Sequence, residues 1–187
     1  MSERTMTTRP PFKKTGEGVW AASGGLVVAG PDEVAFLKEN VRGVERRRAR
    51  ICAHADDQEL LQDMLILLER GTYVRPHLHR DKAESLCVIE GEADAVFFDD
   101  AGAITEAITI GPAHTGRQFF YRISSPRFHT LLLRSDHFIF HETTTGPFRR
   151  EFTQAAPWAP EEGDPAAGDY LSSLEGQVRA FIRNGVE

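Results

Sequence analysis

The chain of 187 residues has the length of one domain, and its 41% apolar content is enough to fill a hydrophobic core. No apolar run approaches the roughly 18 residues of a membrane-spanning helix, so no membrane partner is expected. The net charge of -6 argues against nucleic acid as the main partner, because phosphate binding needs a broad basic surface. Cys52 and Cys87 lie far apart and fit reduced thiols, which favours a cytoplasmic location.

The N-terminal part predicts little regular structure before one short helix. Residues 1–18 show almost no apolar periodicity and are expected to form a mobile arm. A short strand is predicted over residues 25–29. Pro31 suits the first position of a helix, which we expect to continue through about Asn40.

A cluster of arginines follows this helix. Its members are Arg46, Arg47, Arg48 and Arg50. One interpretation is a solvated or locally salt-bridged segment, since Glu45 stands beside it. The other is a clamp for a phosphate or carboxylate, because arginine presents a planar fork of donors. Both interpretations stay open on the sequence alone.

The middle of the chain predicts a series of short strands. Asp56 and Glu59 have the spacing of a helix-capping box, so a helical turn over 56–62 followed by a buried strand over 63–69 is expected. Further strands are predicted over residues 72–79, 84–90, 92–98, 103–110, 117–123, 128–134 and 136–142. Turn residues such as Gly91 separate most of them. Strands of this length and spacing indicate a sandwich or barrel.

After Gly146 the composition shifts toward proline, alanine and acidic residues, which is typical of a linker. Apolar residues at helical spacing then predict an amphipathic helix over 169–183. We therefore expect one domain in three parts. These are an arm with a strand and helix (1–55), a β-barrel (56–155), and a linker with a C-terminal helix (156–187).

One short segment has the spacing of a metal site. His77 and His79 are two residues apart, so a strand would present both imidazoles to the same face. A turn then lets the next strand present Glu84 to the same point. Imidazole and carboxylate are good ligands for first-row divalent metals. Pro76 beside them suggests a sheet edge or barrel mouth, where a ligand could enter.

These residues resemble the first motif of the cupin superfamily, in which glycine, His-x-His, glutamate and glycine recur at the gaps seen from Gly71 to Gly91. The resemblance implies an all-β, antiparallel double-stranded β-helix, the cupin jelly-roll barrel, here with a short N-terminal helix and a C-terminal amphipathic helix. It also implies a fourth metal ligand, a histidine from a later motif. His129 is assigned to that position, although Pro126 and Leu133 depart from the usual second motif.

Across roughly residues 45 to 160 the chain resembles the WbuC-like cupin metalloproteins of bacterial surface-polysaccharide gene sets. The stretches that carry this resemblance are Arg47-Arg48-Ala49-Arg50 with His54, Tyr73 to His77 with His79, Glu84 with Glu90-Gly91, Phe97-Phe98-Asp99, His129-Thr130, Glu142 with Gly146-Pro147-Phe148, and Trp158-Ala159-Pro160. The resemblance implies a metal site in a carbohydrate context and, for His54, a place in the pocket lining.

Other residues are candidates for roles around the metal. Strand alternation from 73 to 79 would put Tyr73 and Arg75 on the face of the histidines, as catalytic and substrate-binding groups. The alternative is that Tyr73 belongs to the core and Arg75 pairs with a carboxylate. Glu142 follows Phe138 and Phe140 at period two, so it is either a buried catalytic acid or base, or part of a salt bridge at the rim.

The leading functional hypothesis is an enzyme, for example an isomerase or epimerase, in which one divalent ion (Zn, Fe, Ni or Mn) acts as a Lewis acid on a sugar or sugar nucleotide. Arg48, Arg50 and Arg75, with Arg47 as a further candidate, would hold its phosphate. The rivals are an Fe(II)-dependent dioxygenase of a small organic substrate and a non-catalytic metal or small-molecule binding protein. The cupin resemblance also implies a homodimer.

Overall fold

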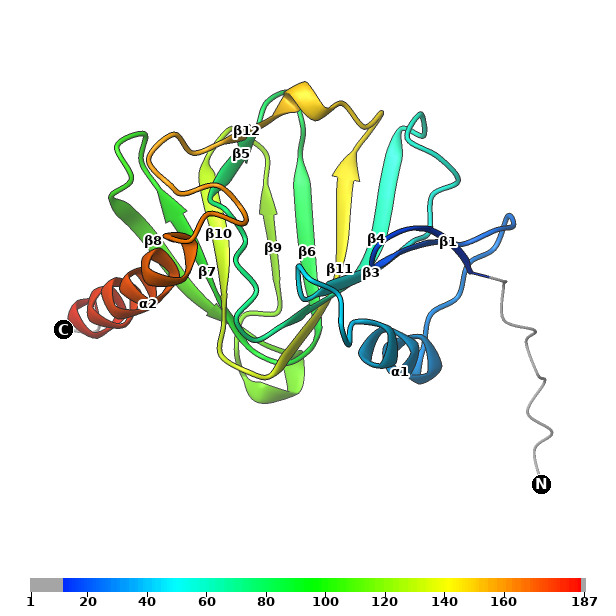
Figure 1. Ribbon diagram of the computed structural model, residues 1–187, viewed down its shortest axis with the longest axis horizontal. Helices are drawn as coiled ribbons and strands as arrows, with labels where there is room; N and C mark the ends of the chain where they lie inside the picture. The colour runs from blue at the N-terminus through cyan, green and yellow to red at the C-terminus, as the bar shows by residue number, and fades with distance from the viewer. Residues whose placement is uncertain (1–11, 186–187) are drawn as a thin grey trace.

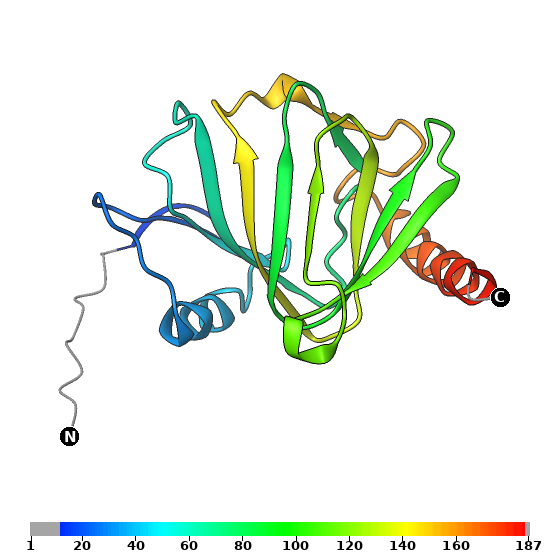
Figure 2. The ribbon, with the colours of Figure 1, turned by 180° about the vertical axis from the view of Figure 1, so that it is seen from behind.

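The computed structural model describes residues 12–185, and most of them lie in two β-sheets that face each other as the walls of an open barrel (Figure 1; Figure 2). The seven-stranded sheet has the order β1 (Lys13–Gly16), β2 (Val19–Ala21), β3 (Arg48–Cys52), β4 (Leu61–Glu69), β11 (His137–Thr145), β6 (Glu84–Glu90) and β9 (Phe120–Ile123). The five-stranded sheet has the order β12 (Thr153–Ala155), β5 (His77–His79), β10 (Phe128–Leu133), β7 (Ala93–Phe98) and β8 (Ile104–Ile110).

The pairing between neighbouring strands is that of a jelly roll. Every pair is antiparallel except β2 with β3, and some neighbours come from distant parts of the chain, such as β4 beside β11 and β5 beside β10. The expected all-β cupin fold is thus confirmed, as two facing sheets rather than a closed barrel. Two single turns of 3-10 helix, η1 (Ala113–Thr115) and η2 (Arg150–Phe152), lie in the connections.

One helix covers the outer face of each sheet (Figure 1; Figure 2). Helix α1 (Pro31–Asn40) begins at proline as predicted and packs Leu37 on the seven-stranded sheet. Helix α2 (Ala167–Asn184) confirms the predicted amphipathic helix and packs Leu174 and Val178 on the five-stranded sheet. No helix among residues 12–185 is both long and apolar enough to span a membrane.

The interior between the sheets is apolar at one end and polar at the other. On β11, Phe138 and Phe140 are buried in the core between the sheets, and Glu142, two residues further along the same face, lines a cavity. On β10, Leu131 belongs to that core and His129 lines the cavity. The same alternation that builds the core therefore delivers polar side chains to the open end.

The structure corrects several predictions for the N-terminal half. Residues 25–29 form no strand, and Leu26 there is 74% exposed. The arm expected over 1–18 contains β1 from residue 13 onward, while residues 1–11 lie outside the described part. Strand β3 was not predicted, because its two arginines, Arg48 and Arg50, alternate with the buried residues and mask their apolar pattern. The predicted turn over 56–62 is not helical.

Local hydrogen bonds explain why residues 56–62 form no helical turn and why residues 72–76 form no strand. Asp56 accepts the backbone N–H of Gln58 at 2.7 Å, which forms a side-chain turn in place of a helix, and β4 starts at Leu61. Residues 72–76 are not part of a strand, and only His77–His79 forms β5. The hydroxyl of Thr72 donates to the carbonyl of Glu69 at 2.7 Å and so continues the turn that follows β4.

The segment predicted as a linker is packed against the barrel. It contains η2 and β12, and β12 pairs with β5 through Thr153 opposite His79. Further on, the ring of Trp158 lies 5.0 Å from the ring of Phe98, as part of the core under α2. This segment thus supplies one wall of the site described below.

We predict that Gly91→Ala destabilises the fold. Gly91 has a φ of +82°, and a Cβ there would lie 2.1 Å from the carbonyl oxygen of His137. The free energy of unfolding should fall by about 2 kcal/mol, which corresponds to a Tm lower by roughly 5 °C in a thermal unfolding experiment. Gly176→Ala on α2 is the control, because its Cβ would meet no atom within 4 Å, and it should stabilise slightly. An unchanged Tm for Gly91→Ala would contradict the clash.

Candidate metal site

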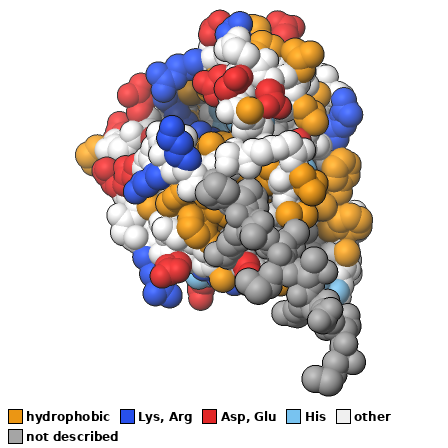
Figure 3. Space-filling model, turned by 90° about the vertical axis from the view of Figure 1, so that its right-hand side faces the viewer, with side chains coloured by type: hydrophobic (Ala, Val, Ile, Leu, Met, Phe, Trp, Pro, Cys, Tyr) orange, Lys and Arg blue, Asp and Glu red, His pale blue; other side chains and the backbone are white. Residues whose placement is uncertain are grey.

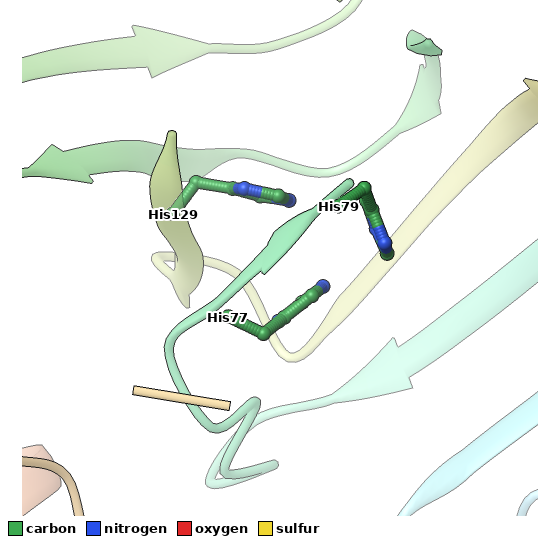
Figure 4. Close-up of side chains that lie close together, drawn as sticks. All are labelled: His77, His79 and His129. Atoms are coloured by element: carbon green, nitrogen blue, oxygen red, sulfur yellow. The ribbon is translucent and has the colours of Figure 1, made fainter. Parts of the chain in front are cut away.

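Three histidine side chains converge at the polar end of the barrel (Figure 4). His77 and His79 point from the same face of β5, and His129 on β10 is the register partner of His77. The ring centroids of His77 and His129 are 4.6 Å apart. One ring nitrogen from each of the three lies within 4.8 Å of the others, so the group could hold a metal ion.

Hydrogen bonds at Nδ1 determine which ring nitrogen of His77 and His129 carries the proton. Nδ1 of His77 lies 2.9 Å from the carbonyl oxygen of Arg75, and Nδ1 of His129 lies 2.9 Å from that of Arg127. A carbonyl oxygen can only accept a hydrogen bond, so both Nδ1 atoms carry the proton. In the neutral rings, Nε2 therefore keeps its lone pair. Protein metal sites hold histidine ligands in the same way.

Glu84 faces the histidines from the first residue of β6, in the opposite sheet. Its Oε2 lies 2.9 Å from Nε2 of His79, and its Oε1 lies 3.6 Å from Nε2 of His129. The side chain is buried, 6% exposed, so its charge has few partners besides these imidazoles. The structure thus brings together the four residues that the sequence singled out as ligands.

The pKa values in this group reflect burial and close pairing. Burial lowers the pKa of His77 to about 4, with the nearby His129 adding to the effect, so His77 is neutral at pH 7. Burial alone would raise the pKa of Glu84, but the contacts with His129 and His79 outweigh it and lower the pKa. Burial opposes the charged form of His129, yet Glu84 raises its pKa. The result is a carboxylate that contacts His79 and His129, beside a neutral His77 that is ready to act as a ligand.

This donor set fits a divalent first-row transition metal. Neutral imidazole and carboxylate suit zinc, iron, nickel and manganese, and three or four protein ligands leave positions open for water or a substrate. The hydrogen bonds at Nδ1 of His77 and His129 are what such a site requires around its ligands. The chemistry of the site does not select one metal among these.

The four residues lie in a cavity of ≈ 1690 Å³. Its walls come from both sheets and from the loops at the open end of the barrel. Figure 3 shows basic and acidic side chains gathered around a hollow in the surface. The charged residues that line the cavity, besides the four candidate ligands, are Glu17, Arg46, Arg48, Arg50, Asp56, Asp57, Arg75, Lys82, Glu142, Arg150, Glu161 and Glu162, with His54 as a further titratable group.

Glu142 is the carboxyl group with the largest upward shift near the histidines. Burial, reinforced by the negative charge of Glu84, raises its pKa to about 8, although Arg50 and Lys82 act in the opposite direction. The carboxyl group is therefore protonated at neutral pH and can donate or accept a proton near that pH. This position agrees with the inward-facing alternative in the sequence rather than with a salt bridge at the rim.

Sequence reasoning missed two further residues beside Glu142. Lys82 is buried, 9% exposed, and its Nζ lies 5.6 Å from the ring centre of Phe148. Burial raises the pKa of Tyr121 well above its usual range, and the charges of Glu84 and Glu142 add to the shift. Lys82 precedes Glu84 by two residues and so was open to detection from the motif, whereas Tyr121 faces inward only because β9 pairs with β6.

The four predicted substrate-binding residues all line the cavity, but they differ in their interaction partners. Arg48 pairs with Glu162 at 2.7 Å. Arg75 donates to the carbonyl of Ala156 at 3.2 Å and lies 3.7 Å from Glu161, as in the alternative in which it pairs with a carboxylate. Nδ1 of His54 lies 3.0 Å from the carbonyl of Asp63. Among residues 12–185, Arg50 has no ion pair, so its charge is available to a ligand.

The structure places Tyr73 away from the cavity, which corrects its assignment as a catalytic residue. Its hydroxyl donates to the carbonyl of Pro160 at 2.9 Å, and its ring packs edge-on against Tyr170 of α2 at 6.0 Å. The prediction assumed strand alternation from residue 73 onward. Because regular strand geometry begins only at His77, that alternation does not extend to Tyr73.

Comparisons with known proteins find one family model that matches part of the chain. The model of a family described as a domain of unknown function (DUF6016) matches residues 32–110, which is less than half of the chain. No curated protein matches the sequence. The family region includes His77, His79 and Glu84 but ends before His129.

Several solved structures are similar over part of their length. Procruciferin, an 11S globulin from Brassica napus, is 17% identical with a TM-score of 0.40, over 47% of this chain and 21% of its own. A sugar phosphate isomerase from a cupin superfamily of Silicibacter pomeroyi is 22% identical with a TM-score of 0.37, over 46% and 51%. CapF, solved with the inhibitor 3-isopropenyl-tropolone, is 16% identical with a TM-score of 0.49, over 60% and 32%. The chain thus matches about half or less of each of them, and its own sheet topology carries the fold assignment.

Proposed function

We propose that this protein is a metal-dependent enzyme that binds one divalent transition metal ion through His77, His79, His129 and Glu84. The observation that carries the proposal is the pair of Nδ1 hydrogen bonds to backbone carbonyls, which turns the Nε2 lone pairs of His77 and His129 toward a common point. A bound ion would act as a Lewis acid on a carbonyl or hydroxyl oxygen of the substrate.

The residues around the ion suggest how the reaction would proceed. Glu142, whose pKa is raised to about 8, would give a proton to a substrate oxygen or take one from a neighbouring carbon or hydroxyl. Arg50 lies exposed in the same cavity and would hold an anionic group of the substrate. Lys82, largely enclosed, would place a positive charge beside Glu142. Proton transfer with charge stabilisation suits an isomerase or epimerase.

The substrate class that we propose is a sugar or sugar nucleotide. The support is twofold. The cavity of ≈ 1690 Å³ is large enough for such a molecule and is lined by many polar groups. The sequence also resembles WbuC-like cupins along roughly residues 45 to 160, which implies a role in surface polysaccharides. A cytoplasmic homodimer and the division into arm, barrel and C-terminal part remain components of this proposal.

Three measurements on the purified protein would test the proposal. Elemental analysis should find about one transition metal ion per chain, and thermal-shift screening should find nucleotide sugars that raise Tm more than organic acids do. Oxygen consumption with bound Fe(II) and an organic substrate would instead support a dioxygenase. Saturable ligand binding with no turnover would support a binding protein. A protein without metal after supply of all four candidate ions would refute the proposal.

A further inference from the structure

We propose that Arg46, Arg48 and Arg50 form a binding site for oxyanions at the mouth of the cavity, and that Glu162 occupies this site as an internal carboxylate until a phosphate or carboxylate ligand displaces it. The inference deepens the proposed function, on which it rests for the position of the reacting group. The anion site itself can be tested without any metal.

The three arginines are spaced two residues apart, and the side chains of all three line the cavity. Arg48 and Arg50 belong to β3 and are two residues apart, so they share the face that lines the cavity, and Arg46 lines it as well. Arg47 between them does not line the cavity and instead donates to the carbonyl of Arg70 at 3.1 Å. The site therefore consists of three guanidinium groups along one edge of the cavity.

Within residues 12–185, Glu162 is the one carboxylate that forms ion pairs with this group. Oε2 of Glu162 lies 2.7 Å from Nη2 of Arg48 and also contacts Nη2 of Arg46. Arg50 has no ion pair among the described residues. Glu17 also lines the cavity, but its carboxylate accepts the backbone N–H of Glu45 at 3.2 Å. One negative charge thus offsets only part of the positive charge of three arginines.

The loop that carries Glu162 is anchored on the opposite sheet. Upstream of Glu162, the ring of Trp158 packs against Phe98 and Phe128 at 5.0 and 5.8 Å, and the carbonyl of Pro160 accepts the hydroxyl of Tyr73 at 2.9 Å. Phe98 and Phe128 belong to the five-stranded sheet, whereas β3 belongs to the seven-stranded sheet. The contact of Glu162 with the arginines consequently spans the cavity mouth from one sheet to the other.

The contact is built so that a ligand can replace it. The side chains of Arg46, Arg48 and Glu162 are 58%, 28% and 30% exposed, and ion pairs in contact with water are weak. A phosphate offers more charge and more acceptor oxygens than one carboxylate, and the arginine fork matches it in two hydrogen bonds. An incoming oxyanion would therefore replace Glu162 on the arginines and release the contact between the loop of Glu162 and the seven-stranded sheet.

Isothermal titration with pyrophosphate, and separately with succinate, tests this site in chelator-treated protein at low ionic strength. Glu162→Gln should tighten binding of one of these anions by roughly fivefold, because the competing charge is removed. Arg46→Gln should weaken it by a similar factor, and since Arg46 is mostly exposed, this variant should keep its fold. Glu175→Gln, which removes a carboxylate paired with Arg179 on α2, is the control and should bind like the unmodified protein.

The outcomes separate this inference from the proposed function. Tighter binding of pyrophosphate by Glu162→Gln assigns a phosphate to the site, and tighter binding of succinate alone assigns a carboxylate. Unchanged or weaker binding of both anions by that variant, with Tm equal to that of the control, would overturn the inference. Metal content measured on untreated samples of the same proteins tests the metal site independently, so either idea can fail alone.

Discussion

His79→Ala is expected to lower bound metal from about one ion per chain to less than about a tenth, which corresponds to a loss of affinity of at least roughly a hundredfold. The substitution removes one of the three convergent nitrogens and also the partner of Glu84 Oε2 at 2.9 Å. Because His79 lies in a three-residue strand held on both sides by β12 and β10, the fold should persist. Elemental analysis and circular dichroism measure both effects.

A histidine outside the cavity provides the matched control for this experiment. His114 lies exposed in η1, so His114→Ala should leave metal content unchanged. His129→Ala should reproduce the loss seen with His79, since its Nε2 faces the same point. Full metal occupancy in both His79→Ala and His129→Ala would place the ion elsewhere in the protein.

The second large effect is expected from Glu142→Gln. Its pKa is raised from 4.5 to about 8, so the folded protein holds a proton that the unfolded chain releases. This contribution to stability is complete below pH 4.5 and is lost as pH rises through 8. Between pH 5 and pH 9 the free energy of unfolding of the unmodified, chelator-treated protein should thus fall by about 4 kcal/mol relative to that of Glu142→Gln, or roughly 10 °C in Tm.

The same variant tests the role of Glu142 in the reaction. Glutamine keeps the shape of the side chain but cannot transfer a proton, so turnover should fall by at least roughly a hundredfold while metal content stays unchanged. Glu39→Gln on the exposed side of α1 is the control for both measurements. A pH profile of Tm that is identical in the unmodified protein and Glu142→Gln would contradict the shifted pKa.

The part of the site that lies close together in the sequence could be predicted from the sequence. His77, His79 and Glu84 fall within eight positions, and strand alternation followed by one turn is enough to place them together. Glu142 could also be predicted, because Phe138 and Phe140 mark the inward face of a long strand. In both cases the local pattern and the tertiary structure agree, which is why short-range reasoning succeeded.

The rest of the site depends on contacts between distant segments. Tyr121 reaches the cavity through the pairing of β9 with β6, and Glu162 through ion pairs with residues more than a hundred positions earlier. Tyr73 fits the pattern of an inward-facing residue, but the strand that would orient it begins later, at His77. Such features follow from strand pairing and loop packing, which a single sequence does not specify.

The pairing of β5 with both β10 and β12 has a consequence for when the proposed metal site can form. The segments that build the site run from His77 to Thr153, whose hydroxyl lies 3.1 Å from Nδ1 of His79. During synthesis at the ribosome the ligand cage is incomplete until this last segment has emerged and folded back. Insertion of the proposed ion would therefore be a late event in biogenesis, and the ions then available would decide which one is captured.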